Sequence, residues 1–318
     1  MRSGYGALAS LCLAIAGPVG AQDASDFDCA STHAGEGGAV VIETTLGETP
    51  AVVRIPSKIR QSPILLWHGF GPPVGERALM EALPLDDVPA VKVYLGLPMF
   101  GSRAPKEGAD DLAHRQQRDL ATLVFEPVVM EAAKELPEVV HALEQRGCLK
   151  PGERIGLFGF SAGGAAVLYA LAERDVPIGV AVTLNATTGL SASVNAYERA
   201  TKMEYRWTDA ARSIAQRSDA PGRAKEIASG QPPPALLIIH GNDDAMLTTD
   251  VASALHRALL PRYEAAHAPE RLQLQLVPEL AHAWTSSPGA QALSSSIAAW
   301  FHTHQSAACE PTRESGAC

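Results

Sequence analysis

Short apolar runs recur along the chain at spacings that predict the strands of a largely buried sheet. Five of these runs are continuous, which is typical of parallel strands covered on both faces: 64–67, 91–95, 154–158, 180–184 and 235–239. Residues 39–45 and 50–55 are rich in strand-forming side chains and flank Gly47, so they predict a leading hairpin. Residues 272–277 alternate glutamine with leucine and valine, which places this strand near an edge of the sheet.

Segments with a helical pattern lie between these strands. The longest, 112–147, contains Pro127 and Pro137, and it predicts two or three pieces because proline interrupts a helix. Residues 249–260 and 290–301 are shorter and amphipathic. The alternation of strands and helices predicts one α/β domain, in which helices cover both faces of a mostly parallel sheet.

Composition and charge narrow the range of partners. With 318 residues, of which 46% are hydrophobic, the chain is long enough for one large α/β domain with a sizeable core. The formal net charge is −9 and no basic cluster offsets it, which disfavours nucleic acid and anionic membranes as partners. No apolar run is long enough to span a membrane.

The two ends of the chain have the character of processing and linker segments. Residues 1–21 resemble a secretory signal peptide with cleavage near Ala21, because a short apolar run follows Arg2 and ends in small residues. Residues 22–37 are polar and small and predict a linker. The folded domain is therefore expected over 38–305, followed by a polar tail over 306–318.

Four cysteines remain after the signal peptide, and export permits disulfides between them. Four cysteines allow three pairings. We favour Cys309 with Cys318, because the polar tail between them is short, and this leaves Cys29 with Cys148.

The most informative stretch is 154–166, where an apolar run ends in Gly159-Phe160-Ser161-Ala162-Gly163 and passes into an alanine-rich segment. Strand, sharp turn and helix in this order form a nucleophile elbow, which lifts the serine hydroxyl clear of the sheet. A side chain at Gly159 or Gly163 would collide across so tight a bend. A bare G-x-S-x-G also arises by chance at a helix start, but the strand before it and the helix after it favour catalysis by Ser161.

Two later strand ends supply partners for Ser161. One strand runs into Asp243 and Asp244, and the last strand runs into His282. A serine hydroxyl needs a neutral imidazole to take its proton and a carboxylate to orient that imidazole. The order serine, aspartate, histidine is that of an α/β-hydrolase triad, and the His-Gly-x-x-Asp spacing selects Asp244 over Asp243.

A backbone N–H must face the oxyanion that forms when the serine attacks. The first buried strand is followed by Trp-His-Gly-Phe-Gly, and we expect the N–H groups of Phe70 and Ala162 to form the oxyanion hole. The alternative is that the histidine and glycine merely end the strand. We expect Met99 and Trp284 to line a small substrate pocket together with Phe70.

These motifs resemble the α/β-hydrolase superfamily, and within it the serine esterases of the prolyl-oligopeptidase-like and dienelactone-hydrolase-like group. The resemblance covers about residues 50–303 and rests on the elbow, the run 232–241 with Asp244, the loop 97–103, and His282. It implies an α/β-hydrolase fold with an eight-stranded, mostly parallel sheet flanked by helices on both faces. It also implies hydrolysis of carboxylic esters through an acyl-serine, without cofactor or metal.

Two departures from that group concern specificity. Dienelactone hydrolases carry a cysteine where this chain has Ser161. Prolyl peptidases carry a propeller domain ahead of the hydrolase, and the roughly fifty residues that precede the resemblance are too few to build one.

The sequence therefore predicts an exported serine hydrolase that acts on small esters. A peptidase or amidase on the same triad, and a catalytically silent binding protein, are the alternatives. Segment 186–231 exceeds the ~10–15 residues that a crossover needs, so it can form a small cap over Ser161. Its aromatic residues are mixed with many charges, which favours small, soluble esters over long acyl chains. The oligomeric state stays open.

Overall fold

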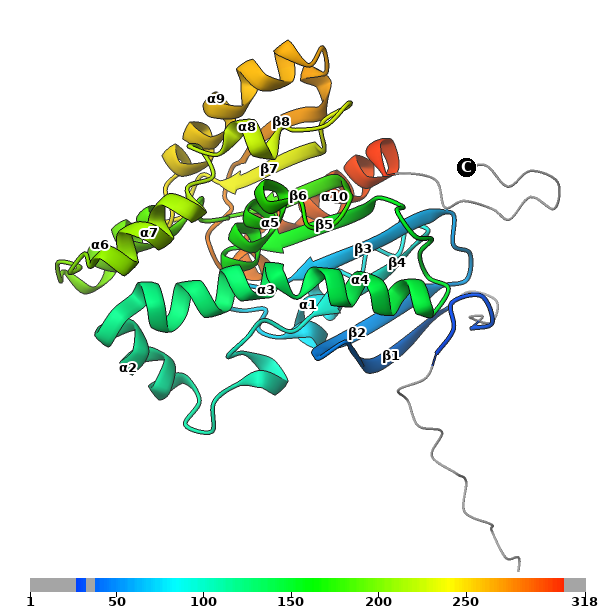
Figure 1. Cartoon of the computed structure of the whole chain (residues 1–318), viewed down its shortest axis with the longest axis horizontal. Coiled ribbons are helices and arrows are strands. Elements are labelled where there is room, and N and C mark those ends of the chain that lie inside the picture. Colours follow the sequence, from blue (N-terminus) through cyan, green and yellow to red (C-terminus); the bar gives the residue numbers. More distant parts are fainter. Residues whose placement is uncertain (1–26, 33–37, 306–318) are drawn as a thin grey trace, which may run out of the picture.

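A computed structural model describes residues 27–32 and 38–305, and it contains an eight-stranded sheet in the order β1-β2-β4-β3-β5-β6-β7-β8 (Figure 1). The strands are β1 (Ala39–Leu46), β2 (Thr49–Pro56), β3 (Gln61–Trp67), β4 (Ala90–Leu95), β5 (Ile155–Phe160), β6 (Ile178–Leu184), β7 (Ala235–Gly241) and β8 (Leu272–Val277). β2 runs antiparallel to both of its neighbours, and the pairs from β4 to β8 are parallel. The predicted mostly parallel, eight-stranded sheet is confirmed.

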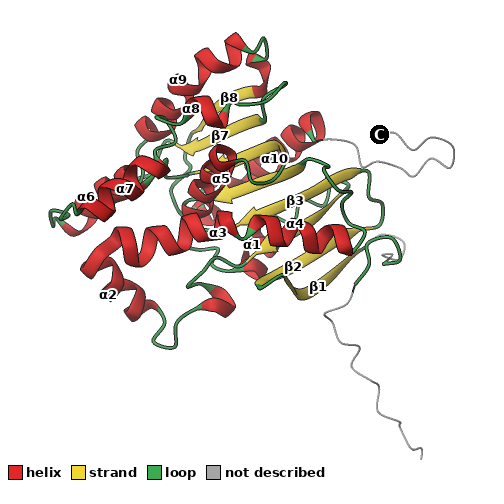
Figure 2. Ribbon diagram, in the orientation of Figure 1, coloured by secondary structure: helices red, strands yellow, loops and turns green. Residues whose placement is uncertain are grey.

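Helices cover both faces of this sheet (Figure 2). On one face, α5 (Ala162–Glu173) and α9 (Thr249–Ala265) bury a core that also receives side chains from the long segment before β5. On the other face, α1 (Glu76–Ala82) and α10 (Gln291–His304) bury a second core. The strands between the two cores are buried on both sides, which explains their continuous apolar sequences.

The long helical segment is divided, but its first break does not lie at a proline. It consists of α2 (Ala109–Leu120), the π-helical η2 (Ala121–Met130), α3 (Glu131–Lys134) and α4 (Leu136–Gln145). Asp119 has a non-helical backbone, and its Oδ1 accepts the N–H groups of Ala121 and Thr122 at 3.0 and 3.2 Å. The break is therefore set by a capping carboxylate. Pro127 lies within the π-helical turns, and Pro137 occupies the first turn of α4, where a missing N–H costs nothing.

Residues 27–32 lie within the predicted linker, yet they are packed against the domain. Phe27 and Cys29 are buried, and the Cys29 N–H donates to the carbonyl of Arg146 at 2.9 Å. Cys29 forms a disulfide with Cys148 across 119 residues of sequence, so this predicted pairing is confirmed. A covalent loop of that length restricts the unfolded chain, which typically stabilises a fold by about 2–4 kcal/mol.

The other predictions for the chain ends concern residues that the structure does not describe. The signal peptide over 1–21, the tail over 306–318 and the cysteine pair Cys309 and Cys318 all lie outside the described residues. Within the described ranges, none of the helices has the length and apolar character needed to cross a membrane.

Lys92 is a cation buried inside the sheet. Its side chain in β4 is fully buried, and Nζ donates to the carbonyl of Val88 at 2.9 Å. The opposite residue on β2, Arg54, forms an ion pair with Asp86 at 2.6 Å. Burial lowers the pKa of Lys92 to about 8, an effect that Asp86 opposes and Arg54 strengthens.

Candidate active site

Ser161 lies between the end of β5 and the start of α5, in the sharp turn that the sequence predicts. Its backbone has φ 54° and ψ −114°, a conformation that costs energy for a residue with a Cβ atom. A Cβ atom on Gly159 would lie 2.2 Å from the carbonyl oxygen of Gly163, and one on Gly163 would lie 2.4 Å from that of His68. The bend therefore requires glycine at both positions.

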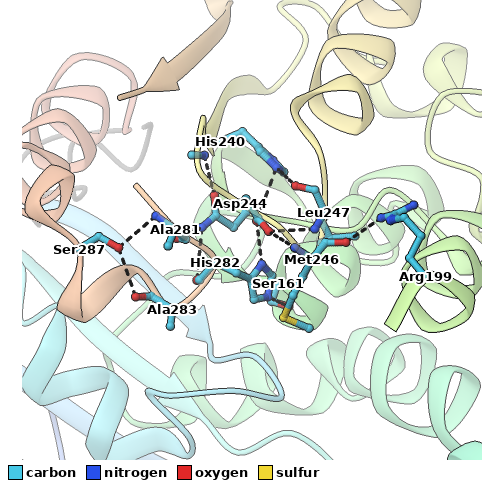
Figure 3. Close-up of polar contacts among 12 residues, drawn as sticks. Ser161, Arg199, His240, Asp244, Met246, Leu247, Ala281, His282, Ala283 and Ser287 are labelled. Carbon is cyan, nitrogen blue, oxygen red and sulfur yellow. Dashed lines mark hydrogen bonds and ion pairs between the residues drawn. The ribbon is translucent and has the colours of Figure 1, made fainter. Parts of the chain in front are cut away.

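Ser161, His282 and Asp244 form a continuous chain of hydrogen bonds (Figure 3). Ser161 Oγ lies 3.0 Å from His282 Nε2, and His282 Nδ1 lies 2.7 Å from Asp244 Oδ2. The Asp244 side chain is fully buried, whereas the His282 side chain is 11% exposed and so accessible from the cavity. Asp243 is exposed, with its N–H bonded to the carbonyl of Leu280. The structure thus brings together the three residues that the sequence selects.

The Asp244 carboxylate is held from several sides. Its Oδ1 accepts the N–H groups of Met246 and Leu247 at 2.9 and 2.8 Å. His240 lies on the other side, with Nε2 3.6 Å from Asp244 Oδ2 and 2.7 Å from the carbonyl oxygen of Leu247. Burial lowers the pKa of His240, which favours its neutral form, and its Nε2 donates to the carbonyl of Leu247. These contacts fix the carboxylate in the direction of His282.

Asn185 is a part of the site that the sequence reasoning missed. It is fully buried directly after β6, with a positive φ of 45°. Its Nδ2 donates to the carbonyls of Ala281 and His282 at 2.9 and 3.3 Å, and its Oδ1 accepts the N–H of Gly241 at 2.8 Å. One side chain therefore joins the loop that carries Asp244 to the loop that carries His282. The available signal was an asparagine at the carboxyl end of a buried strand, where functional groups of parallel sheets gather.

A buried histidine orients the loop after β3. His68 Nδ1 lies 2.7 Å from the carbonyl oxygen of Gly69, and His68 Nε2 accepts the N–H of Leu97 at 3.3 Å. Burial lowers the pKa of His68 to about 4, so the neutral ring donates through Nδ1. The Gly69 carbonyl and the Phe70 N–H belong to one planar peptide and point in opposite directions. By holding the carbonyl, His68 fixes the direction of the Phe70 N–H.

A cavity of about 370 Å³ opens beside Ser161 and His282. Its lining is mainly apolar and comes from the loop after β3, from α2 and η2, from α6 (Leu190–Thr201), and from the Asp244 loop. The lining residues include Phe70, Gln116, Leu120, Phe125, Val129, Ala162, Thr187, Ser193, Ala196, Tyr197, Arg199, Ala200, Thr201, Ala245, Met246 and Leu247. The wall formed by α2 and η2 was not expected from the sequence.

Of the three predicted pocket residues, only Phe70 lines this cavity. Met99 is half-buried and packs on the core, whereas the ring of the next residue, Phe100, stacks on Phe70 at 4.9 Å. Trp284 is buried and turns inward, with its ring 6.3 Å from that of Phe160. Both predictions are therefore corrected: packing of these two side chains against the core removes them from the cavity surface.

Segment 186–231, predicted as a possible cap, contains α6, α7 (Asp209–Ser218) and α8 (Ala224–Ile227). Of these three helices, α6 alone borders the cavity, and it does so over most of its length. The connection to α7 is tied to α2 by Tyr205, whose hydroxyl donates to Asp119 Oδ1 at 2.8 Å. Both α2 and α6 border the cavity, and this bond joins α2 to the connection that follows α6. Among the described residues, no three His, Cys, Asp or Glu side chains are grouped so as to hold a metal ion.

A model of the prolyl oligopeptidase family matches residues 131–307, more than half of the 318-residue chain. No protein of curated function matches the sequence. Among solved structures, a Thermus thermophilus protein has a TM-score of 0.61 at 18% identity, over 83% of this chain and 98% of its own. Carboxyl esterase 2 from the mycorrhizal fungus Tuber melanosporum has a TM-score of 0.54 at 17% identity, over 86% of this chain and 89% of its own. Acylaminoacyl peptidase from Pyrococcus horikoshii has a TM-score of 0.57 at 14% identity, over 86% of this chain and 42% of its own. At these identities the likeness is one of fold.

Proposed function

Because the chain belongs to the prolyl oligopeptidase family of α/β-hydrolases, we propose that it is an exported serine esterase that cleaves small carboxylic esters. The observation that carries this proposal is the hydrogen-bonded chain Ser161–His282–Asp244 at the edge of an apolar cavity. Such a triad hydrolyses esters through an acyl-serine intermediate and needs neither a metal nor an organic cofactor.

In the first half of the reaction, Ser161 Oγ attacks the ester carbonyl while His282 Nε2 takes its proton across the 3.0 Å contact. Asp244 stabilises the resulting imidazolium through its 2.7 Å bond to Nδ1. His282 then protonates the departing alcohol. In the second half, a water molecule attacks the acyl-serine with His282 again acting as the base, which releases the acid and restores Ser161.

The oxyanion of each tetrahedral intermediate is assigned to the N–H groups of Phe70 and Ala162. Ala162 is the first residue of α5, so its N–H has no acceptor within the helix. The loop before Phe70 passes so close to the elbow that a Cβ atom on Gly69 would lie 2.8 Å from Ser161 Cβ. Loss of one such donor typically costs about 3–4 kcal/mol in the transition state.

The cavity supports a small ester substrate. Its volume of about 370 Å³ lies near the lower end of the range for small-molecule sites. Apolar side chains such as Leu120, Phe125 and Val129 can bury a short acyl or alcohol group. We therefore expect kcat/KM to be highest for short acyl chains, as measured with a series of 4-nitrophenyl esters below their micelle thresholds. Efficiency that rises through dodecanoyl would contradict this expectation.

Export is proposed on two grounds. Residues 1–21 have the pattern of a signal peptide, and disulfides such as Cys29–Cys148 form and persist mainly in oxidising compartments. Amino-terminal sequencing of protein recovered outside the cytoplasm tests this: cleavage near Ala21 is expected, and an intact Met1 would contradict it.

Peptide or amide hydrolysis is the second candidate, favoured by the match to a family named for a peptidase. The cavity lining holds no aspartate or glutamate among the described residues, so no carboxylate is placed there to bind a peptide amino group. This favours the ester. Matched 4-nitrophenyl esters and 4-nitroanilides of the same acids separate the two functions, and faster cleavage of the anilides would reverse the assignment.

The experiment that tests the proposal combines labelling with turnover. A fluorophosphonate probe is expected to label the wild type but not Ser161→Ala, and 4-nitrophenyl acetate is expected to be hydrolysed by the wild type alone. Absence of both labelling and turnover in folded wild-type protein would instead favour a silent binding protein.

A further inference from the structure

Arg199 carries the single permanent charge among the described residues that line the cavity. It lies in the last turn of α6, and its Nη2 donates to the carbonyl of Met246 at 2.7 Å. Figure 3 shows the side chain reaching from α6 toward the loop that holds Asp244. The guanidinium is thereby fixed at the rim of the cavity that contains Ser161 and His282.

No acidic side chain in the described ranges forms an ion pair with Arg199. Six other arginines do pair with aspartate or glutamate: Arg54, Arg77, Arg103, Arg115, Arg217 and Arg223. The adjacent carboxylate, Glu198, accepts the N–H of Tyr205 at 2.7 Å instead. A guanidinium has five N–H donors and Met246 occupies one of them, so Arg199 has donors left for a further acceptor.

We infer that Arg199 binds a carboxylate on the substrate, and that the preferred esters therefore carry an anionic group at the end away from the scissile bond. This inference rests on the proposed ester hydrolysis and adds the substrate class. A planar guanidinium matches the two oxygens of a carboxylate. A phosphate carries nearly two charges at neutral pH, and the lining offers one cation to balance them.

The rest of the molecule does not attract anions by itself. The formal net charge is −9, so long-range electrostatics oppose the approach of an anionic substrate, and any preference must come from the local contact. Arg199 is exposed, and water weakens an ion pair at such a place. The expected contribution is therefore about fivefold to tenfold in kcat/KM.

The test uses ester pairs that differ only in charge. One pair places the charge on the acyl side: the 4-nitrophenyl monoester of adipic acid and that of the matching monoamide. The other places it on the alcohol side: the acetyl esters of 3-hydroxybenzoate and 3-hydroxybenzamide. For at least one pair, the ratio of kcat/KM, carboxylate over carboxamide, should fall about fivefold to tenfold in Arg199→Gln. Arg199→Lys should restore part of it.

Arg212→Gln is the matched control. Arg212 is an exposed arginine on α7 outside the cavity lining, so its loss changes the net charge by the same amount and should leave the ratio unchanged. An unchanged ratio in Arg199→Gln for both pairs, or an equal fall in Arg212→Gln, would overturn the inference. An equal loss on both members of each pair would also overturn it, because Arg199 would then only hold the Met246 loop.

A binding measurement keeps the two proposals distinguishable. If the wild type hydrolyses none of the four esters, the proposed ester hydrolysis fails, and calorimetric titration with adipate alone still tests Arg199. Weaker binding of adipate by Arg199→Gln than by the wild type supports the inference. Equal binding by both proteins, or none by the wild type, overturns it.

Discussion

The floor and the wall of the cavity hold their side chains in different ways. The floor consists of the loops after β5, β7 and β8, and it carries Ser161, Asp244 and His282. Each of these side chains is fixed by hydrogen bonds to the others, and the Asp244 carboxylate receives two more from backbone N–H groups. The wall consists of α2, η2 and α6. Its two outer helices, α2 and α6, are partly exposed, and few polar contacts join them to the rest of the site.

This difference separates the two tasks of the site. Proton transfer requires atoms placed within about 0.5 Å of the productive geometry, which a buried network on strand ends provides. Substrate choice needs only a surface of suitable shape and charge, and helices at the cavity edge can supply it. Substitutions in the floor should therefore lower kcat, and substitutions in the wall should change KM and substrate preference.

The largest effect is expected for the floor's central pair. Ser161→Ala and His282→Ala should each lower kcat for 4-nitrophenyl acetate by about ten-thousand-fold while leaving the circular dichroism spectrum unchanged. The double variant should be scarcely worse than either single one, since the two groups act as a unit. Additive losses would mean that these residues are not partners.

The next largest loss of kcat is expected for one of the two neighbouring aspartates, Asp244, and not for the other. Asp244→Asn should lower kcat by about a thousandfold or more, because the imidazole loses the acceptor that orients it. Asp243→Asn is the matched control, and its exposed side chain predicts a change of a few-fold at most. The reverse result would move the acid of the triad by one residue.

An intermediate effect is expected for Asn185, which supports the floor from the end of β6 but touches no reacting atom. Asn185→Ala removes three side-chain hydrogen bonds, two to the His282 loop and one to Gly241 at the start of the Asp244 loop. We expect kcat to fall about tenfold to a hundredfold with little change in KM, together with a lower Tm. Asn242→Ala, an exposed change in the Asp244 loop, is the control. A lower Tm with unchanged kcat at low temperature would make Asn185 a purely structural residue.

The smallest effect is expected in the wall. Tyr205→Phe removes the hydroxyl that joins the α6–α7 connection to Asp119 before η2. We expect KM for a short ester to change about twofold to threefold and kcat to stay the same, since one hydrogen bond contributes about 1 kcal/mol. Tyr197 itself lines the cavity, and Tyr197→Phe should change KM and kcat by no more than Tyr205→Phe does. A large fall in kcat would show that the wall supports the triad as well as the substrate.

The same contrast explains what the sequence could predict. The eight strands and the floor follow from local signals: continuous apolar runs, a glycine-flanked serine, and polar residues just after strand ends. The wall depends on how α2, η2 and α6 are placed around the cavity, and no local sequence pattern encodes that placement. The break at Asp119 shows this, because proline positions suggested another division of the helix. The role of Asn185 could not be predicted either, since its side-chain partners come from two other loops.

Lys92 gives the protein an unusual response to alkali. Between the folded-state pKa of about 8 and the ordinary lysine value of 10.5, the unfolded chain holds a proton that the folded chain lacks. The folded state is therefore favoured more strongly as pH rises through this window, by up to about 3 kcal/mol. Above it, Tyr94 acts in the opposite direction, because burial raises its pKa and the unfolded chain loses that proton first. At neutral pH the buried charge is a standing cost. Lys92→Met should raise the free energy of unfolding at pH 7, and this advantage over the wild type should shrink toward pH 10 in urea titrations.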